Sequence, residues 1–135
     1  MFLNCLTIIN IQKIPIFKKN LLMHELSIAM NIIDIASEQA RINNLSIIDE
    51  IEIEIGKLSG VEIDALKFAM EIATKRTILE NSKTIISEIP GQARCLNCLQ
   101  EFMIDNFFAQ CPECKHFNFE IIHGQELRVK SLNVY

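Results

Sequence analysis

The chain has 135 residues, half of them hydrophobic, and a formal net charge of −4. This length fits one ordinary domain or two very small ones, and the scarcity of glycine and proline argues against long disordered tracts. An acidic balance repels phosphate backbones, so nucleic acid is a poor default partner, and no apolar run is long enough to predict a transmembrane helix.

Residues 1–22 are predicted to be an extension outside the main fold. They lack the basic start and the small-residue cleavage site of a secretory signal. We expect translation to begin at Met23, and the alternative is a flexible or strand-like extension. Because the extension holds three lysines and no acid, a chain that starts at Met23 has 10 basic and 17 acidic residues and a charge of −7.

Apolar residues recur at helical spacing between Leu26 and Asn43, which predicts an amphipathic helix. Its core side is expected to consist of Leu26, Met30, Ile33 and Ala40, widened by Ala29, Ile32 and Ala36. Strict alternation from Glu50 to Ile55 then predicts a strand with Ile51, Ile53 and Ile55 facing the core and the glutamates facing water.

The segment Ser59-Gly60-Val61-Glu62 has the S-x-x-E form of a capping box, so a second helix is predicted to begin here and run to about Arg76. Its residues at core spacing are Leu66, Ala69, Met70 and Ala73. Further strands are predicted over residues 84–89, 119–122 and 126–134, with a boundary at Pro90-Gly91 and a breaker at Gly124.

These elements predict an α+β fold, in which two helices lie on a small sheet of about three strands and a zinc-ribbon-like four-cysteine module is inserted. Residues 23–92 together with about 124–135 are expected to form the α+β domain. Residues 93–123 are expected to form the cysteine domain.

Four of the five cysteines form two pairs, Cys95/Cys98 and Cys111/Cys114, separated by twelve residues, and Cys5 stands alone. Two C-x-x-C knuckles can direct four thiolates at one ion in a tetrahedron, which suits a structural zinc whose binding supplies folding free energy. This spacing is typical of metal ligation in a reducing compartment, so we expect a cytoplasmic protein. His116 is expected to be an exposed loop histidine, and coupling to the cysteine site is the alternative.

The cysteines leave other functions open. An iron site shares the ligand set and would make the protein a rubredoxin-like electron carrier. A thioredoxin-like redox role normally needs a single C-x-x-C at a helix start. A zinc-ribbon module that binds other proteins or nucleic acid is a further alternative, against which the acidic balance and the few basic–aromatic clusters argue.

The segment Met23-His24-Glu25 has special chemistry when Met23 is the first residue. The free α-amine of Met23, the His24 imidazole and the amide nitrogens of His24 and Glu25 can then surround one metal ion. A square-planar nitrogen set selects nickel(II) or copper(II) over zinc, and binding depends on pH because the amine must lose its proton. Behind an extension, His24 is simply an early helix residue.

Two glutamates could contribute to this site. Glu25 either offers an axial carboxylate to the metal or places favourable charge at a helix N-terminus. Glu62 either approaches the same site or completes the Ser59 capping box. His123, beside Gly124, is interpreted as structural.

The MHELSI segment from Met23, the GKLSGV turn from Gly56, the paired knuckles and the GQEL segment from Gly124 together resemble the HypA/HybF family of hydrogenase-maturation nickel chaperones. The resemblance covers residues 23 to about 134 and implies nickel at Met23 and His24, with the Glu25 amide helping and Glu62 nearby. It implies zinc at the four paired cysteines. Family members begin at the methionine that is Met23 here, so the extension departs from the pattern.

The resemblance also implies partners and a mode of action. The partners are a nickel-handling maturation GTPase and the large subunit of a [NiFe] hydrogenase, and some relatives also serve urease. We expect a carrier and no enzyme, because the sequence offers no Ser/His/Asp set, P-loop or G-x-G-x-x-G to support catalysis.

Overall fold

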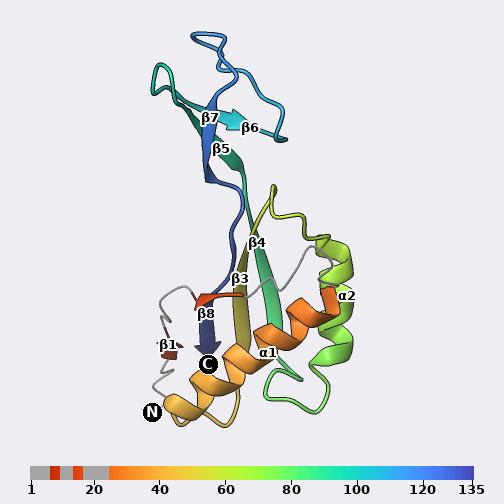
Figure 1. Ribbon diagram of the computed structural model, residues 1–135. Helices are drawn as coiled ribbons and strands as arrows, with labels where there is room; N and C mark the ends of the chain where they lie inside the picture. Colours follow the sequence, from red (N-terminus) through yellow and green to blue (C-terminus); the bar gives the residue numbers. More distant parts are fainter. Residues whose placement is uncertain (1–6, 10–13, 17–24) are drawn as a thin grey trace. The chain divides into compact units, whose positions relative to one another are not determined.

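The computed structural model describes residues 7–9, 14–16 and 25–135. Cys5, Met23 and His24 lie outside the described residues. No helix in the described part of the chain has both the length and the apolar character that a membrane span needs. The elements, which Figure 1 labels except for β2, are β1 (Thr7–Ile9), β2 (Ile14–Pro15), α1 (Glu25–Ile42), β3 (Glu50–Gly56), α2 (Ile63–Ala73), β4 (Lys83–Ile89), β5 (Gly91–Cys95), β6 (Glu101–Ile104), β7 (Phe119–His123) and β8 (Leu127–Val134).

The chain divides into two units. The first contains the described residues up to Ile53, Glu62–Ile86 and Arg128–Tyr135, and the second contains Glu54–Val61 and Ser87–Leu127. The main sheet has the strand order β1-β8-β3-β4, with β2 also paired to β8, and helices α1 and α2 contact each other. The smaller sheet has the order β6-β5-β7.

The predicted α+β class is confirmed, because the three expected strands β8, β3 and β4 are neighbours in the main sheet. Two short strands from the extension add to it. β1 pairs antiparallel with the end of β8, so that Thr7 lies opposite Val134, and β2 pairs with its start. These two segments therefore match the strand-like alternative for the extension.

The isoleucines of β3 are fully buried, as their alternation predicts. The expectation that the glutamates face water is wrong for two of them, because Glu50 and Glu54 are only 8% and 5% exposed. β3 lies between β8 and β4, so both of its edges are paired and the side chains of two neighbouring strands flank its own. The Tyr135 hydroxyl donates a hydrogen bond to Glu50, and Glu54 also has an interaction partner.

The expected core side of α1 is displaced by part of a turn. The buried positions repeat at four-residue intervals as Ile28, Ile32, Ala36 and Ala40, with Ala29 beside them. Leu26 and Met30 were expected in the core but are 48% and 57% exposed. The sequence offers apolar residues on two adjacent stripes, and packing against the sheet selects one of them.

The predicted capping box does not form. Helix α2 begins at Ile63 after the N-cap Glu62, which makes no side-chain cap hydrogen bond. The Ser59 hydroxyl instead accepts a hydrogen bond from the Val61 amide at 3.3 Å, and Gly60 has a φ of 79°. The motif is therefore a turn before the helix. The helix also ends at Ala73, short of the expected Arg76.

Two segments that the sequence analysis singled out lie side by side in the second unit. The amide of Gly56 donates to the carbonyl of Glu126, and the amide of Leu58 donates to the carbonyl of Gly124, both at 2.7 Å. A Cβ atom on Gly56 would lie 1.9 Å from the Gly124 oxygen, so only glycine fits there. The small core nearby is formed by Leu58, Ala93 and Ile104.

The Glu126 carboxylate stabilises the turn after β7 through two hydrogen bonds. It accepts hydrogen bonds from the Gly124 amide at 2.5 Å and from His123 Nδ1 at 3.2 Å. Burial raises the pKa of Glu126, but the amides of Gly124 and of Glu126 itself, together with His123, outweigh burial and lower this pKa below 4.5. The ionised carboxylate therefore stabilises the fold above pH 4.5, and this contribution is lost as the pH falls through the lowered pKa.

We expect Glu126→Gln to lower the free energy of unfolding by about 1 kcal/mol at pH 7, because an amide oxygen accepts hydrogen bonds more weakly than a carboxylate. The difference should shrink below pH 4.5. Urea denaturation at several pH values measures it. Glu120→Gln is the control, since this half-exposed partner of Arg94 should change stability little. A pH-independent difference at Glu126 would contradict the assignment.

Candidate metal centre

Each cysteine pair lies in a turn of the same construction. In the first, the Cys95 amide donates to the Gln100 carbonyl and the Leu99 amide donates to the Cys95 carbonyl, both at 2.9 Å. In the second, the Cys111 amide donates to the His116 carbonyl at 2.9 Å and the Lys115 amide to the Cys111 carbonyl at 3.0 Å. The two turns therefore use identical offsets along the chain, and each aims two sulfurs the same way.

The turns bring the four sulfur atoms of Cys95, Cys98, Cys111 and Cys114 within 4.8 Å of one another. The Sγ atoms of Cys95 and Cys114 are 3.4 Å apart, and those of Cys98 and Cys111 are 3.6 Å apart. Tetrahedral zinc with bonds of about 2.3 Å places its sulfurs about 3.8 Å apart. These separations are close to that value and far longer than the roughly 2.05 Å of a disulfide. The donor set therefore fits a tetrahedral divalent ion.

The thiols of Cys98 and Cys114 have pKa values shifted in opposite directions. The His116 amide lowers the pKa of Cys114 to about 5, with further help from Cys95, Asn97 and the His116 side chain. The Gln100 amide lowers the pKa of Cys98, but desolvation and the other three thiols outweigh it and raise this pKa to about 12. Mutual repulsion thus opposes ionisation of the whole set, and a divalent cation would supply the charge that four thiolates need.

His116 lies beside the sulfur cluster. Its Nδ1 is 3.2 Å from the Cys114 carbonyl oxygen and 3.3 Å from the Asn97 amide nitrogen. The histidine is exposed, as expected, and it also contacts the site, as the alternative proposed. Asn97 is a contact that the sequence analysis missed, and its place between two cysteine ligands was the available signal.

The residues predicted to bind nickel are only partly described. Glu25 and Glu62 are 37 positions apart in the sequence, yet the Glu62 amide donates a hydrogen bond to Glu25 Oε1 at 3.4 Å. Glu25 is the first residue of α1 and Glu62 is the N-cap of α2. The Glu25 carboxylate thus lies at the N-terminus of α2, where negative charge is favourable.

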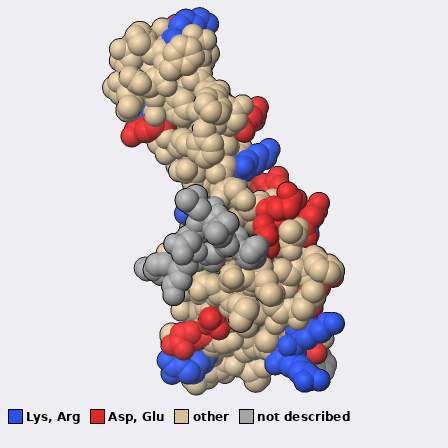
Figure 2. Space-filling view, turned by 45° about the vertical axis from the view of Figure 1, so that its right-hand side comes forward, with Lys and Arg blue, Asp and Glu red and all other residues tan. Residues whose placement is uncertain are grey.

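The distribution of surface charge bears on the nucleic-acid alternative. On the face drawn in Figure 2, the described basic and acidic residues lie in small separate groups and form no continuous basic stripe, which gives no support to a nucleic-acid interface.

His123 is half exposed and contacts Glu126, in keeping with the structural role expected of it.

Comparisons with known proteins place this chain among similar sequences of one family. A family model described as "Hydrogenase/urease nickel incorporation, metallochaperone, hypA" matches residues 23–134. "Hydrogenase maturation factor HypA" of Parabacteroides distasonis is 44% identical over 110 residues, covering 82% of this chain and 96% of the relative. The protein of the same name from Chlorobaculum parvum is 41% identical over 112 residues, covering 83% and 99%.

Two solved structures share the fold. "Solution structure of HypA protein" has a TM-score of 0.65 and covers 84% of this chain and 97% of its own. "Solution structure of the Ni metallochaperone HypA from Helicobacter pylori" has a TM-score of 0.60 and covers 82% and 96%. Each is 24% identical to this chain, so these likenesses establish the fold alone.

Proposed function

Because the chain belongs to the HypA family, we propose that it carries nickel(II) and delivers it during the maturation of [NiFe] hydrogenase. It acts as a binding protein and not as an enzyme. The family match from residue 23 to residue 134 carries this proposal, because it includes both predicted metal sites. By this proposal residues 23–92 with about 124–135 bind nickel and residues 93–123 bind zinc, and the second structural unit extends beyond the latter range to Ser87–Leu127 and also includes Glu54–Val61.

Nickel is bound by nitrogens in a chain whose first residue is Met23. The α-amine of Met23, the imidazole of His24 and the amide nitrogens of His24 and Glu25 make up the planar set. The hydrogen bond from the Glu62 amide to Glu25 Oε1, at 3.4 Å, supports this arrangement. It holds the residue next to His24 at the start of α2.

Zinc is held by the thiolates of Cys95, Cys98, Cys111 and Cys114. The sulfur separations of 3.4 and 3.6 Å support a tetrahedral ion. Bound zinc would supply charge compensation and folding free energy, since a closed set of four thiolates leaves no open position for catalysis. The amides of Gln100 and His116 point at Cys98 and Cys114 and help to stabilise their negative charge.

The partners follow from the proposed cargo. They are a nickel-handling maturation GTPase, the large subunit of a [NiFe] hydrogenase and, by the family description, urease maturation proteins. Reduced cysteine ligands suit the cytoplasm. A nickel site formed by the first residues of a chain allows transfer to such partners without unfolding the carrier.

Nickel titration of two purified forms tests the proposal. One form begins at Met23 with a free amine, and the other has all 135 residues. We expect the first to bind one equivalent of nickel with the visible absorption of a planar nitrogen complex. The second form lacks the free amine of Met23, which is a direct ligand in this proposal. Its nickel affinity should be lower by more than about 10- to 100-fold, because loss of a group that only supports a metal ligand already costs that much.

Zinc content serves as the internal control in this experiment, because the thiolate site does not depend on the amine. Both forms should therefore carry the same amount of zinc. Equal nickel affinity and identical nickel spectra for the two forms would refute the amine ligand.

A further inference from the structure

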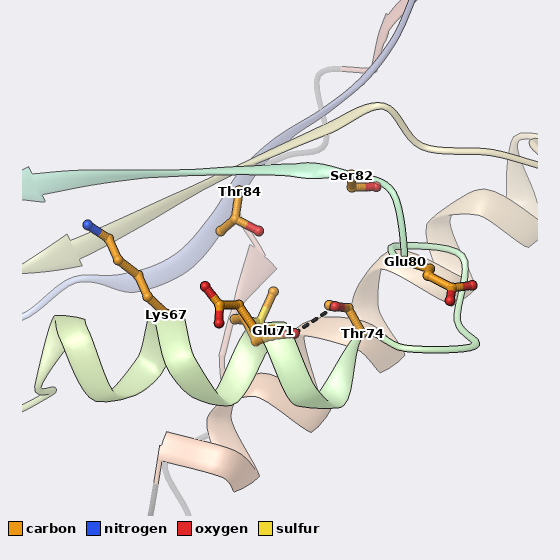
Figure 3. Close-up of a pocket in the computed structure, with 7 residues that line it drawn as sticks. Lys67, Glu71, Thr74, Glu80, Ser82 and Thr84 are labelled. Atoms are coloured by element: carbon orange, nitrogen blue, oxygen red, sulfur yellow. Dashed lines mark hydrogen bonds between the residues drawn. The ribbon is translucent and has the colours of Figure 1, made fainter.

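A polar groove lies between α2 and the start of β4, and none of its lining residues is a predicted metal ligand. It has a volume of about 400 Å³ and is lined by Lys67, Met70, Glu71, Thr74, Glu80, Ser82 and Thr84. All of these residues belong to the first unit. Figure 3 shows Lys67 and Glu80 at opposite ends of the groove, with Glu71 on the helix and Thr84 on the strand between them.

One wall of this groove is a strand edge that no described strand covers. β4 is the last strand in the order of the main sheet, and no described strand pairs with its outer side. The Lys83 amide donates to the Asp49 carbonyl at 2.8 Å, and the Ile89 carbonyl accepts from the Lys57 amide at 2.9 Å. Because backbone groups alternate in direction along a strand, Thr84 and Ile86 direct theirs outward.

Two of the hydroxyl groups in the groove are held by hydrogen bonds to the backbone. Thr74 donates to the Met70 carbonyl at 2.6 Å, and Ser82 donates to the Ile48 carbonyl. Their hydrogens are therefore already used, and their oxygens remain as acceptors. The charged groups are opposite in sign: Lys67 and Glu71 are one helical turn apart, a rise of about 6 Å.

We propose that this groove receives an extended segment of a partner protein, which adds to the main sheet as a strand beside β4. The outward backbone groups of Thr84 and Ile86 supply hydrogen bonds, and alternate side chains of the segment enter the groove. Side chains two positions apart on a strand are about 7 Å apart, which matches the spacing from Lys67 to Glu71. The segment therefore carries an acidic residue that faces Lys67 and a basic residue two positions away that faces Glu71.

Charge favours a different protein over a second copy of this chain as the occupant. A second copy would present its own β4 to the groove. The side chains that share a face with Thr84 are Ile86 and Glu88, and neither is basic. Such a pairing would leave Glu71 without a basic side chain opposite it. This proposal rests on the strand edge and the groove, and it does not depend on the nickel assignment.

A random dodecapeptide library displayed on phage tests the proposal with the full chain as target. Selected peptides should show the acid–base spacing and bind Thr84→Pro at least about tenfold more weakly, because proline removes one outward amide. Thr84→Val is the matched control, since it removes only the hydroxyl and should bind like the parent. Circular dichroism verifies that both variants are folded.

The peptide provides a second measurement that does not perturb the protein. N-methylation at the peptide residues that face β4 should abolish binding, and N-methylation at the intervening residues should not. Recovery of no Thr84-dependent peptide, or equal binding of both methylated forms, would overturn the proposal. So would a concentration-dependent dimer, measured by sedimentation, that Thr84→Pro converts to a monomer, because the occupant would then be a second copy.

Discussion

Replacing Cys111 with serine should release the bound zinc and unfold the second unit. The Cys111 side chain is fully buried, and its backbone forms both hydrogen bonds that shape the second knuckle. Structural zinc contributes on the order of 10–16 kcal/mol of apparent binding free energy in small domains. Apart from the cysteines, the buried apolar side chains described in the second unit are few, namely Ile55, Leu58, Ala93 and Ile104. Loss of one thiolate should therefore be enough to unfold the second unit.

Two measurements on the full chain check this result. Metal analysis after gel filtration should fall from stoichiometric zinc to a small fraction. The NMR signals of β5, β6 and β7 should lose their dispersion, whereas those of α1 and α2 should keep theirs. Cys5→Ser is the matched control and should retain zinc. A folded Cys111→Ser protein with full zinc would contradict the assignment of zinc to the four cysteines. An iron–thiolate absorption in the parent would favour the rubredoxin alternative.

The cysteine cluster could be predicted from sequence because its geometry is mostly local. Each C-x-x-C turn is set by a few neighbouring residues, and the fold has only to bring the two turns together. The sequence did not indicate the left-handed residues that close them, because Leu99 and Lys115, with φ of 64° and 65°, occupy positions where glycine is usual. The contact of His116 with Asn97 also depends on how the two turns face each other.

The fold was predictable where periodicity decides and less so where position in the sheet decides. The alternation in β3 located the strand and its isoleucine face correctly. It could not indicate that β3 lies between two other strands or that Tyr135 reaches Glu50, so the burial of Glu50 and Glu54 was not predicted. Strands β5 and β6 were missed because they are short and contain polar residues. The contact between Glu25 and Glu62 spans 37 positions and likewise follows from the fold alone.

In a chain that begins at Met23, we expect His24→Ala to abolish stoichiometric nickel binding and to leave zinc in place. The substitution removes the imidazole and leaves the amine and two amide nitrogens. Amide nitrogens lose their protons only to a metal that other ligands already hold, so loss of the imidazole should weaken the remaining ligands as well. Parent affinity should also rise with pH as the amine, of reference pKa about 7.7–8.0, loses its proton.

Calorimetric titration with nickel and metal analysis for zinc measure the two outcomes on the same sample. His123→Ala is the matched control, because this half-exposed histidine contacts Glu126 and should not contribute to the nickel site. Glu25→Gln keeps the backbone nitrogen and weakens the contact with Glu62, so it should reduce nickel affinity less than His24→Ala does. Full nickel stoichiometry in His24→Ala would mean that other groups hold the ion, since no planar nitrogen set remains without the imidazole.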